Sequence, residues 1–223
     1  VTRSGTNEFE GSVYASTRSN KKEFVGTKAG QIRIIPATFE EKILGARFGA
    51  PIIKNKLFFF GNFETVDNTS PATTWTSTGS PQPSAQISAP TFQQMQDLST
   101  FMQDKLGYTT GPWENYDAQR VSKKFLAKVD WNINNANKFS VRYVHHDSSS
   151  DELTSNSNSL GFGNRRTNVN SMSFKNSGYS ILDNTRSIVV QLDSKLSESW
   201  NNNFIGGYDK QIEDRGLQGG GLF

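Results

Sequence analysis

Seven stretches of this 223-residue chain alternate apolar and polar side chains with a period of two. In the sharpest stretch, Phe125, Val129 and Trp131 fall on one side and Lys128 and Asp130 on the other. Because neighbouring side chains of a β-strand point to opposite faces, this pattern predicts strands with one apolar face. The predicted strands cover residues 9–17, 43–52, 57–66, 124–131, 139–146, 188–196 and 204–208.

The connections between the predicted strands are alternately long and short. Long connections occupy residues 18–42, 67–120 and 148–184. Short connections occupy residues 53–56, 134–137 and 197–202, and Trp131 and Trp200 lie beside two of them. Outer-membrane barrels have this order, with tight periplasmic turns, long extracellular loops and aromatic girdles. The sequence therefore predicts an all-β, antiparallel, up-and-down transmembrane β-barrel segment. A soluble β-sandwich with its loops at one end is the alternative.

The composition is polar on average, with a mean hydropathy of −0.61 and 34% hydrophobic residues. This average is compatible with a barrel, because only every second strand residue faces lipid. No apolar run reaches the length of about 18 residues that a membrane helix needs. The absence of Cys excludes disulfides, thiol nucleophiles and Cys-based zinc sites. The net charge of +3 is too small and dispersed to indicate a nucleic-acid partner.

One helix is predicted at residues 91–106, inside the second long connection. Phe92, Met95 and Leu98 begin an apolar repeat at helical spacing. Thr91 with Gln94 forms a capping-box pattern, and Gly107 supplies a C-terminal stop. We expect this helix to pack on the extracellular rim.

Two groups of residues are candidates for contact with a solute or with the interior of the barrel. Charges on the polar strand faces are expected to face the lumen or a plug: Glu8, Glu10, Arg47, Glu64, Lys124, Lys128, Asp130 and Arg142. Aromatic and basic residues of the outer loops are candidates for solute contact: Trp75, Trp113, Tyr116, Arg165 and Arg166. The alternative for the loop residues is packing of each loop against its neighbours.

Enzyme motifs are absent from the sequence. His145 and His146 are adjacent on a predicted strand and point to opposite faces, so they cannot bind one metal together. Glu8 and Glu10 share a face, but lumen charges explain them better than a catalytic carboxylate pair. We therefore expect no enzymatic activity, no cofactor and no metal.

Several strings resemble TonB-dependent outer-membrane receptors. Residues 1–14, VTRSGTNEFEGSVY, resemble the junction between the plug and the first barrel strand. Residues 48–64, FGAPIIKNKLFFFGNFE, resemble the first barrel hairpin of the Oar-like branch, which is common in Bacteroidetes. That branch usually has Gly-Gly-Pro here, and this chain has Ala50 in place of the second Gly. Further similar runs are KFLAKVDWNIN at residues 124–134 and SLGFGNRR at residues 159–166.

The resemblance implies a 22-stranded barrel, closed by an N-terminal plug, that imports a scarce solute with energy delivered through TonB. Residues 1–10 would end the plug and form the junction, and residues 11–223 would form about seven strands, the N-terminal third of the barrel. The abrupt start and end of the sequence also lead us to expect a fragment.

The expected partners are the lipid bilayer of the bacterial outer membrane, the rest of the barrel and plug, TonB through a preceding region, and a surface lipoprotein. Two other functions stay open. One is an envelope scaffold or export-accessory barrel without solute uptake, and the other is a cell-surface adhesin or lectin-like binding module.

Overall fold

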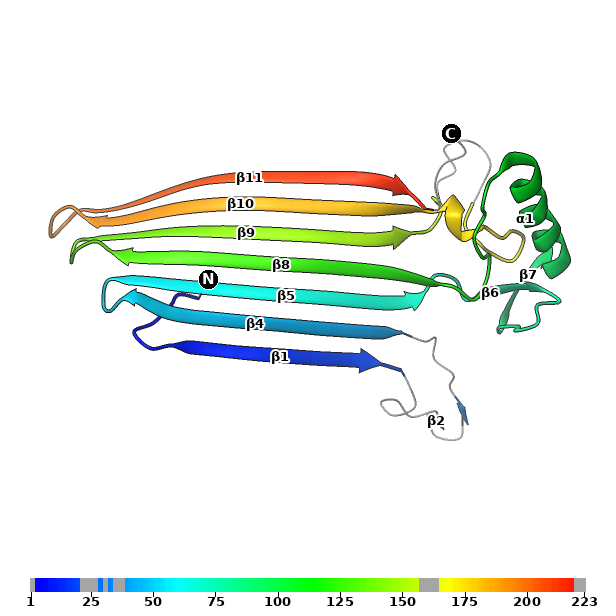
Figure 1. The fold of residues 1–223 in the computed structure, drawn as a ribbon, viewed down its shortest axis with the longest axis horizontal. Coiled ribbons are helices and arrows are strands. Elements are labelled where there is room, and N and C mark those ends of the chain that lie inside the picture. Colours follow the sequence, from blue (N-terminus) through cyan, green and yellow to red (C-terminus); the bar gives the residue numbers. More distant parts are fainter. Residues whose placement is uncertain (1–2, 21–27, 30–31, 34–38, 157–164, 219–223) are drawn as a thin grey trace.

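The computed structural model describes residues 3–20, 28–29, 32–33, 39–156 and 165–218 (Figure 1). Seven long strands form one antiparallel sheet in the order β1-β4-β5-β8-β9-β10-β11. Their bounds are β1 Glu10–Ser19, β4 Glu40–Ile53, β5 Leu57–Pro71, β8 Asp117–Asn132, β9 Asn137–Glu152, β10 Tyr179–Lys195 and β11 Asn201–Leu217. Each strand of the sheet pairs with the one before it, so the predicted up-and-down order and the seven predicted strands are confirmed.

Short turns and long connections lie at opposite ends of the sheet (Figure 1). Asn55, in the turn between β4 and β5, has a positive φ of 63°, a conformation that Asn tolerates better than most residues. At the other end lie the small antiparallel pair β2 (Lys28–Ala29) and β3 (Ile32–Arg33), and the parallel pair β6 (Trp75–Thr78) and β7 (Gln86–Thr91). These two small pairs were not predicted.

The strands extend further toward the long connections than the sequence predicted. β5, β8, β9, β10 and β11 are 15 to 17 residues long, whereas a tilted strand needs only about 9 to 11 residues to cross a bilayer. We call the added residues the strand extensions: 67–71, 117–123, 147–152, 179–185 and 211–217. The prediction of loops at residues 67–71, 117–120, 148–152 and 179–184 was wrong because the extensions are largely polar on both faces, which removes the alternation.

The register aligns the apolar side chains of all seven strands on one face. Phe59, Val129, Val141 and Val190 share one row across β5, β8, β9 and β10. The adjacent row on the same face holds Phe48, Gly61, Ala127, Tyr143, Ile188 and Tyr208. We call this the apolar face, and the side that carries Arg47, Glu64 and Lys128 the polar face.

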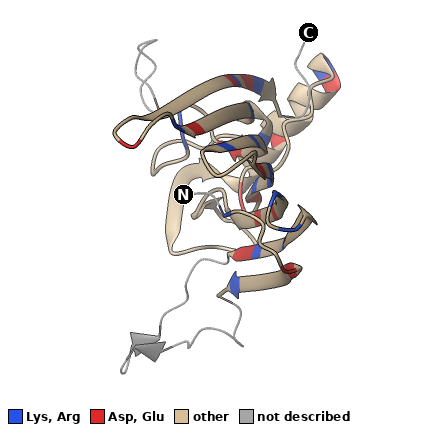
Figure 2. Ribbon diagram, turned by 90° about the vertical axis from the view of Figure 1, so that its left-hand side faces the viewer, with Lys and Arg blue, Asp and Glu red and all other residues tan. Residues whose placement is uncertain are grey.

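No second layer covers the apolar face within the described residues (Figure 1). Ile188 is 46% exposed, Phe204 57% and Tyr208 66%, and Trp131 and Trp200 lie exposed near the short turns. Figure 2 views the sheet along its strands and shows that they do not lie in one plane. An uncovered apolar face on a non-planar sheet is typical of a barrel wall that meets lipid.

The apolar residues end in a different row on different strands at the side of the long connections. On the apolar face, the continuous run of apolar side chains that starts at the short turns ends at Leu44 on β4, Phe125 on β8 and Ile188 on β10. Isolated beyond this run lie Val121, Leu182 and Ile212. Each of the three end positions lies one row closer to the short turns than the one before. Strands tilted in a membrane produce this shift, because a membrane boundary cuts each tilted strand at a different residue.

The predicted helix is confirmed as α1, Phe92–Leu106. Thr91 is its N-cap, the capping box with Gln94 is formed, and Gly107 ends the helix with φ 66°. Met95 is buried with 5% exposure, whereas Leu98, Phe101 and Leu106 of the predicted apolar repeat are exposed, so only part of the repeat packs inward. No helix among the described residues is long and apolar enough to cross a membrane.

Candidate functional site

The predicted lumen charges all lie on the polar face or just before it. The register places Glu10, Arg47, Glu64, Lys124, Lys128, Asp130 and Arg142 on that face. Glu8 precedes β1, and its backbone N–H donates to Thr6 Oγ1 at 3.4 Å. Figure 2 shows basic and acidic residues interspersed over the strands rather than gathered on one element.

Several of these charges form contacts with each other across neighbouring strands. Lys124 Nζ lies 3.2 Å from Glu64 Oε1, and the Tyr14 hydroxyl donates to the other carboxylate oxygen of Glu64 at 2.9 Å. Lys128 Nζ lies 2.8 Å from Asp130 Oδ1. These pairs bridge or run along strands of the polar face, as expected for charges on a water-filled interior wall.

The N-terminal residues 3–8 lie on the polar face near the short turns. Lys128 Nζ donates to Ser4 Oγ at 2.8 Å. The amide of Asn7 donates to Asn55 Oδ1 at 2.6 Å, and the backbone N–H of Asn55 donates to Asn7 Oδ1 at 2.7 Å. A Cβ added to Gly5 would lie 2.4 Å from the carbonyl oxygen of Phe59, so this close approach requires glycine. The chain therefore touches the inner surface of the sheet before it enters β1.

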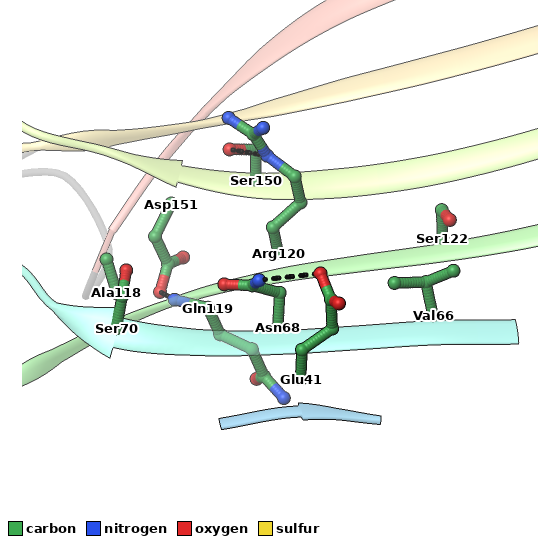
Figure 3. A pocket seen from close by; sticks show the side chains of 10 residues that line it. All are labelled: Glu41, Val66, Asn68, Ser70, Ala118, Gln119, Arg120, Ser122, Ser150 and Asp151. Carbon is green, nitrogen blue, oxygen red and sulfur yellow. Dashed lines mark hydrogen bonds between the residues drawn. The ribbon is translucent and has the colours of Figure 1, made fainter. Parts of the chain in front are cut away.

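A polar pocket of about 330 Å³ lies on the polar face within the strand extensions (Figure 3). The Asn68 amide donates to Glu41 Oε2 at 3.3 Å, and Arg120 Nε donates to Ser150 Oγ at 3.3 Å. Glu41 and Asn68 pair across β4 and β5, and Arg120 and Ser150 pair across β8 and β9. Sequence reasoning missed this pocket because these positions fell in the predicted loops.

Three of the five predicted solute-contact residues line one pocket at the loop end of the sheet. Trp75, Tyr116 and Arg166 border a space of about 210 Å³ together with Leu153. The backbone N–H of Ala72 donates to the carbonyl oxygen of Tyr116 at 3.0 Å. Arg166 Nε donates to the carbonyl oxygen of Thr154 at 2.9 Å. Burial raises the pKa of the Tyr116 phenol, which keeps it neutral.

The other two candidates lie elsewhere. Trp113 packs against Phe92 of α1, with ring centroids 5.1 Å apart, and meets Phe174 edge-on at 5.8 Å. Trp113 therefore occupies an aromatic cluster within the outer loops rather than the pocket of Trp75 and Tyr116. Arg165 is exposed, and its carbonyl oxygen accepts a hydrogen bond from Thr154 Oγ1 at 3.3 Å.

Glu114 holds the outer loops together at a buried position. Its carboxylate accepts from the backbone N–H of Ser77 at 2.7 Å, from the Ser77 hydroxyl at 2.6 Å and from Ser80 Oγ at 2.5 Å. Glu114 itself is 8% exposed. A buried carboxylate with several donors fixes the positions of β6 and of the segment next to Tyr116, and so shapes the neighbouring pocket.

The two histidines lie on opposite faces of β9. His145 pairs with Phe125 and Arg186 on the apolar face, whereas His146 pairs with Lys124 and Thr185 on the polar face. The prediction that the two side chains point to opposite faces is therefore confirmed. Within the described residues, no group of three or more His, Asp or Glu side chains could hold a metal ion.

Residues 1–110 match the family model described as "Outer membrane beta barrel domain". No curated protein and no solved structure matches the chain. The match agrees with the up-and-down sheet, the uncovered apolar face and the oblique boundary. The chain is thus a segment of an outer-membrane β-barrel protein, located in the bacterial outer membrane and in contact with its lipid bilayer.

Proposed function

We propose that this chain forms part of a TonB-dependent transporter of the Oar-like type, which imports a scarce solute or oligomer by rearrangement of a plug. The observation that carries this proposal is the path of residues 3–8. These residues cross the polar face at the turn end, which is the periplasmic end of the barrel. A chain that arrives at β1 from the lumen is what a plug followed by a barrel requires.

The contacts of this segment support its role as the end of the plug. Lys128 holds Ser4, Asn55 holds Asn7 through two hydrogen bonds, and Gly5 permits contact with the backbone of β5. An N-terminal segment that merely preceded a hollow barrel would gain nothing from this pattern. A junction that anchors a movable plug needs a fixed end, and these contacts supply one.

The two edges of the sheet support a larger barrel. Among the described residues, β1 and β11 have no outer neighbour. Unpaired backbone groups in hydrocarbon each cost several kcal/mol, so other strands must pair with both edges. In our proposal the rest of the barrel supplies those strands, TonB binds a region outside this sequence, and a surface lipoprotein covers the outer mouth.

The pocket of Trp75, Tyr116 and Arg166 is the proposed first contact for the solute. Aromatic faces stack on sugars and other planar groups, and a guanidinium pairs with carboxylates or phosphates. The Arg166 side chain is held by its hydrogen bond to the carbonyl oxygen of Thr154. The backbone of Tyr116 is held by its hydrogen bond from Ala72, which keeps this residue at the rim of the pocket. No bond is made or broken in this proposal, because the chain binds and passes the solute.

The test compares uptake with and without TonB in cells that express the complete protein. Solutes are first screened for uptake that is lost when the gene is deleted. For such a solute, we expect deletion of TonB to abolish uptake while the barrel remains in the outer membrane at normal level. Undiminished uptake would contradict the proposal, and the absence of any gene-dependent solute would favour the scaffold or export-accessory function.

A second measurement separates solute capture from adhesion. We expect Trp75→Ala to raise the solute concentration needed for half-maximal uptake, with Trp113→Ala as the control for general damage to the loops. If cells bound a surface ligand through this pocket and showed no uptake of any form of it, the adhesin or lectin-like function would replace the transporter.

A further inference from the structure

On the apolar face, which is the outer face of the barrel wall, basic side chains lie at the end of the apolar run that is closer to the long connections. On that face Lys123 follows Phe125 on β8, His145 follows Tyr143 on β9, Arg186 follows Ile188 on β10 and Lys210 follows Tyr208 on β11. We call these four basic residues the boundary cluster. β4 repeats the pattern, because Lys42 follows Leu44 on the same face. Closer to the loops the face carries isolated apolar side chains, Val121, Leu182 and Ile212.

The boundary cluster lies at the level of the outer lipid headgroups. It adjoins exposed Ile188 and Tyr208, which lie one row closer to the short turns. Two strand residues span roughly 7 Å, so the cations begin within that distance of side chains that face hydrocarbon. The long connections are extracellular in such barrels, so this boundary faces the outer leaflet.

The ion pairs of the boundary cluster leave positive charge unbalanced. Asp147 Oδ1 lies 2.8 Å from Arg186 Nη1, and Asp147 Oδ2 lies 2.7 Å from His145 Nε2, so one carboxylate serves two basic groups. Among the residues that the structure describes, neither Lys123 nor Lys210 has an acidic group within ion-pair distance.

Arg186 and Lys210 stand directly opposite each other on β10 and β11. Like charges at directly opposed positions of a sheet destabilise it. An anion held between the two side chains would offset this repulsion. On the polar face, by contrast, Lys124 and Lys128 each have a carboxylate within 3.2 Å. The unbalanced cations therefore distinguish the outer face at this level.

Among the described residues, Asp147 is the one acidic residue at the level of the boundary cluster on the outer face, where it stands opposite Lys123. The other acidic residues of that face, among them Asp67 on β5, Asp151 on β9 and Asp214 on β11, lie closer to the loops. A strand surface exposed only to water has no reason to gather basic residues at one level and to place most carboxylates beyond it. Contact with a layer of negative headgroups does give that order, since basic residues are attracted to anionic lipid and acidic ones are repelled.

We propose that the boundary cluster binds the phosphate groups of an outer-leaflet lipid, with the acyl chains of that lipid against Ile188 and Tyr208. Guanidinium and ammonium groups are the usual partners of phosphate, and Arg186 is held in place by Asp147 to present its planar group. The occupant is a phosphorylated glycolipid of the outer leaflet. This inference does not depend on the transport proposal, because it concerns the outside of the wall.

The test measures lipid binding to the complete barrel in detergent by native mass spectrometry. The probes are a bisphosphorylated lipid A and the same lipid without its phosphates. We expect wild-type protein to prefer the phosphorylated form, and Arg186→Gln/Lys210→Gln to weaken its binding roughly tenfold or more. Lys124→Gln, adjacent to Lys123 but on the polar face, should leave lipid binding unchanged.

Single variants test the proposal without the risk that the loss of an ion pair unfolds the barrel. Lys123→Gln and Lys210→Gln remove no ion pair within the described residues, and each should weaken binding of the phosphorylated lipid roughly fivefold. Heat-modifiable migration of the barrel on gels confirms that the variants are folded. Equal binding of the two lipids by wild-type protein, or equal binding of the phosphorylated lipid by wild type and all variants, would overturn the proposal.

Discussion

The membrane part of the sheet and the strand extensions share one hydrogen-bonded ladder but differ in their side chains. In the membrane part, β8 places Phe125, Ala127 and Val129 on one face and Lys128 on the other. In its extension, residues 117–123 are largely polar on both faces. This difference shows that the solvent on each face of the sheet sets the side-chain pattern. The backbone hydrogen bonding continues through both regions whatever that solvent is.

The largest expected difference between these two regions concerns one substitution made at two positions of β8. Val129 and Val121 lie on the same face, eight residues apart, the first in the membrane part and the second in the extension. Val129→Arg should cost about 2 to 4 kcal/mol of folding free energy near the bilayer midplane. Val121→Arg should cost about 0 to 1 kcal/mol. Urea unfolding of the complete barrel in lipid vesicles measures both, and equal costs would refute the assignment of the membrane boundary.

A smaller effect is expected where the N-terminal segment covers the polar face of the membrane part. Gly5→Ala would place a Cβ 2.4 Å from the carbonyl oxygen of Phe59 and 3.0 Å from that of Ala50. Overpacking of this kind costs about 1 to 3 kcal/mol, so we expect residues 3–8 to detach. Hydrogen exchange of their amides measures this, and Gly11→Ala is the control, since its nearest contact would be 3.4 Å. Unchanged exchange in Gly5→Ala would show that the segment does not lie against β5.

The smallest effect concerns the loop region beyond the extensions, which folds by its own local signals. Thr91→Ala removes the N-cap of α1 and should destabilise that helix by about 1 kcal/mol. Gln93→Ala removes only the exposed contact with Asp97 and should cost about 0.2 to 0.5 kcal/mol. Exchange rates of the α1 amides compare the two, with no change expected in β8. If β8 amides exchanged faster as well, the loop region and the sheet would not be independent.

The sequence predicted the features that depend on local chemistry or on a solvent difference. Alternation located the membrane part of all seven strands, because lipid and water select different side chains there. The capping box of Thr91 and Gln94 located α1 to within one residue. The extensions were missed because water lies on both of their sides, so a run such as DSSSDE at residues 147–152 carries no periodic signal.

The candidate site was predictable in its residue types but not in its grouping. Trp75, Tyr116 and Arg166 meet in one pocket although 91 positions separate the first from the last, and only tertiary structure brings them together. Trp113 looked equivalent in sequence, yet it packs against Phe92 and Phe174. The solute-contact role of all five loop residues stays a prediction, as does the contact of the lumen charges with a plug.

Spin labels along β8 test the central claim most directly, namely that one face of the sheet meets lipid in its membrane part and water in its extension. The chain has no native Cys, so single Cys substitutions give unambiguous labelling sites. In the complete barrel in vesicles, labels at Ala127 and Val129 should be accessible to oxygen and protected from a water-soluble nickel reagent. Labels at Gln119 and Val121 should show the reverse. Equal access of the nickel reagent to all four positions would contradict the account.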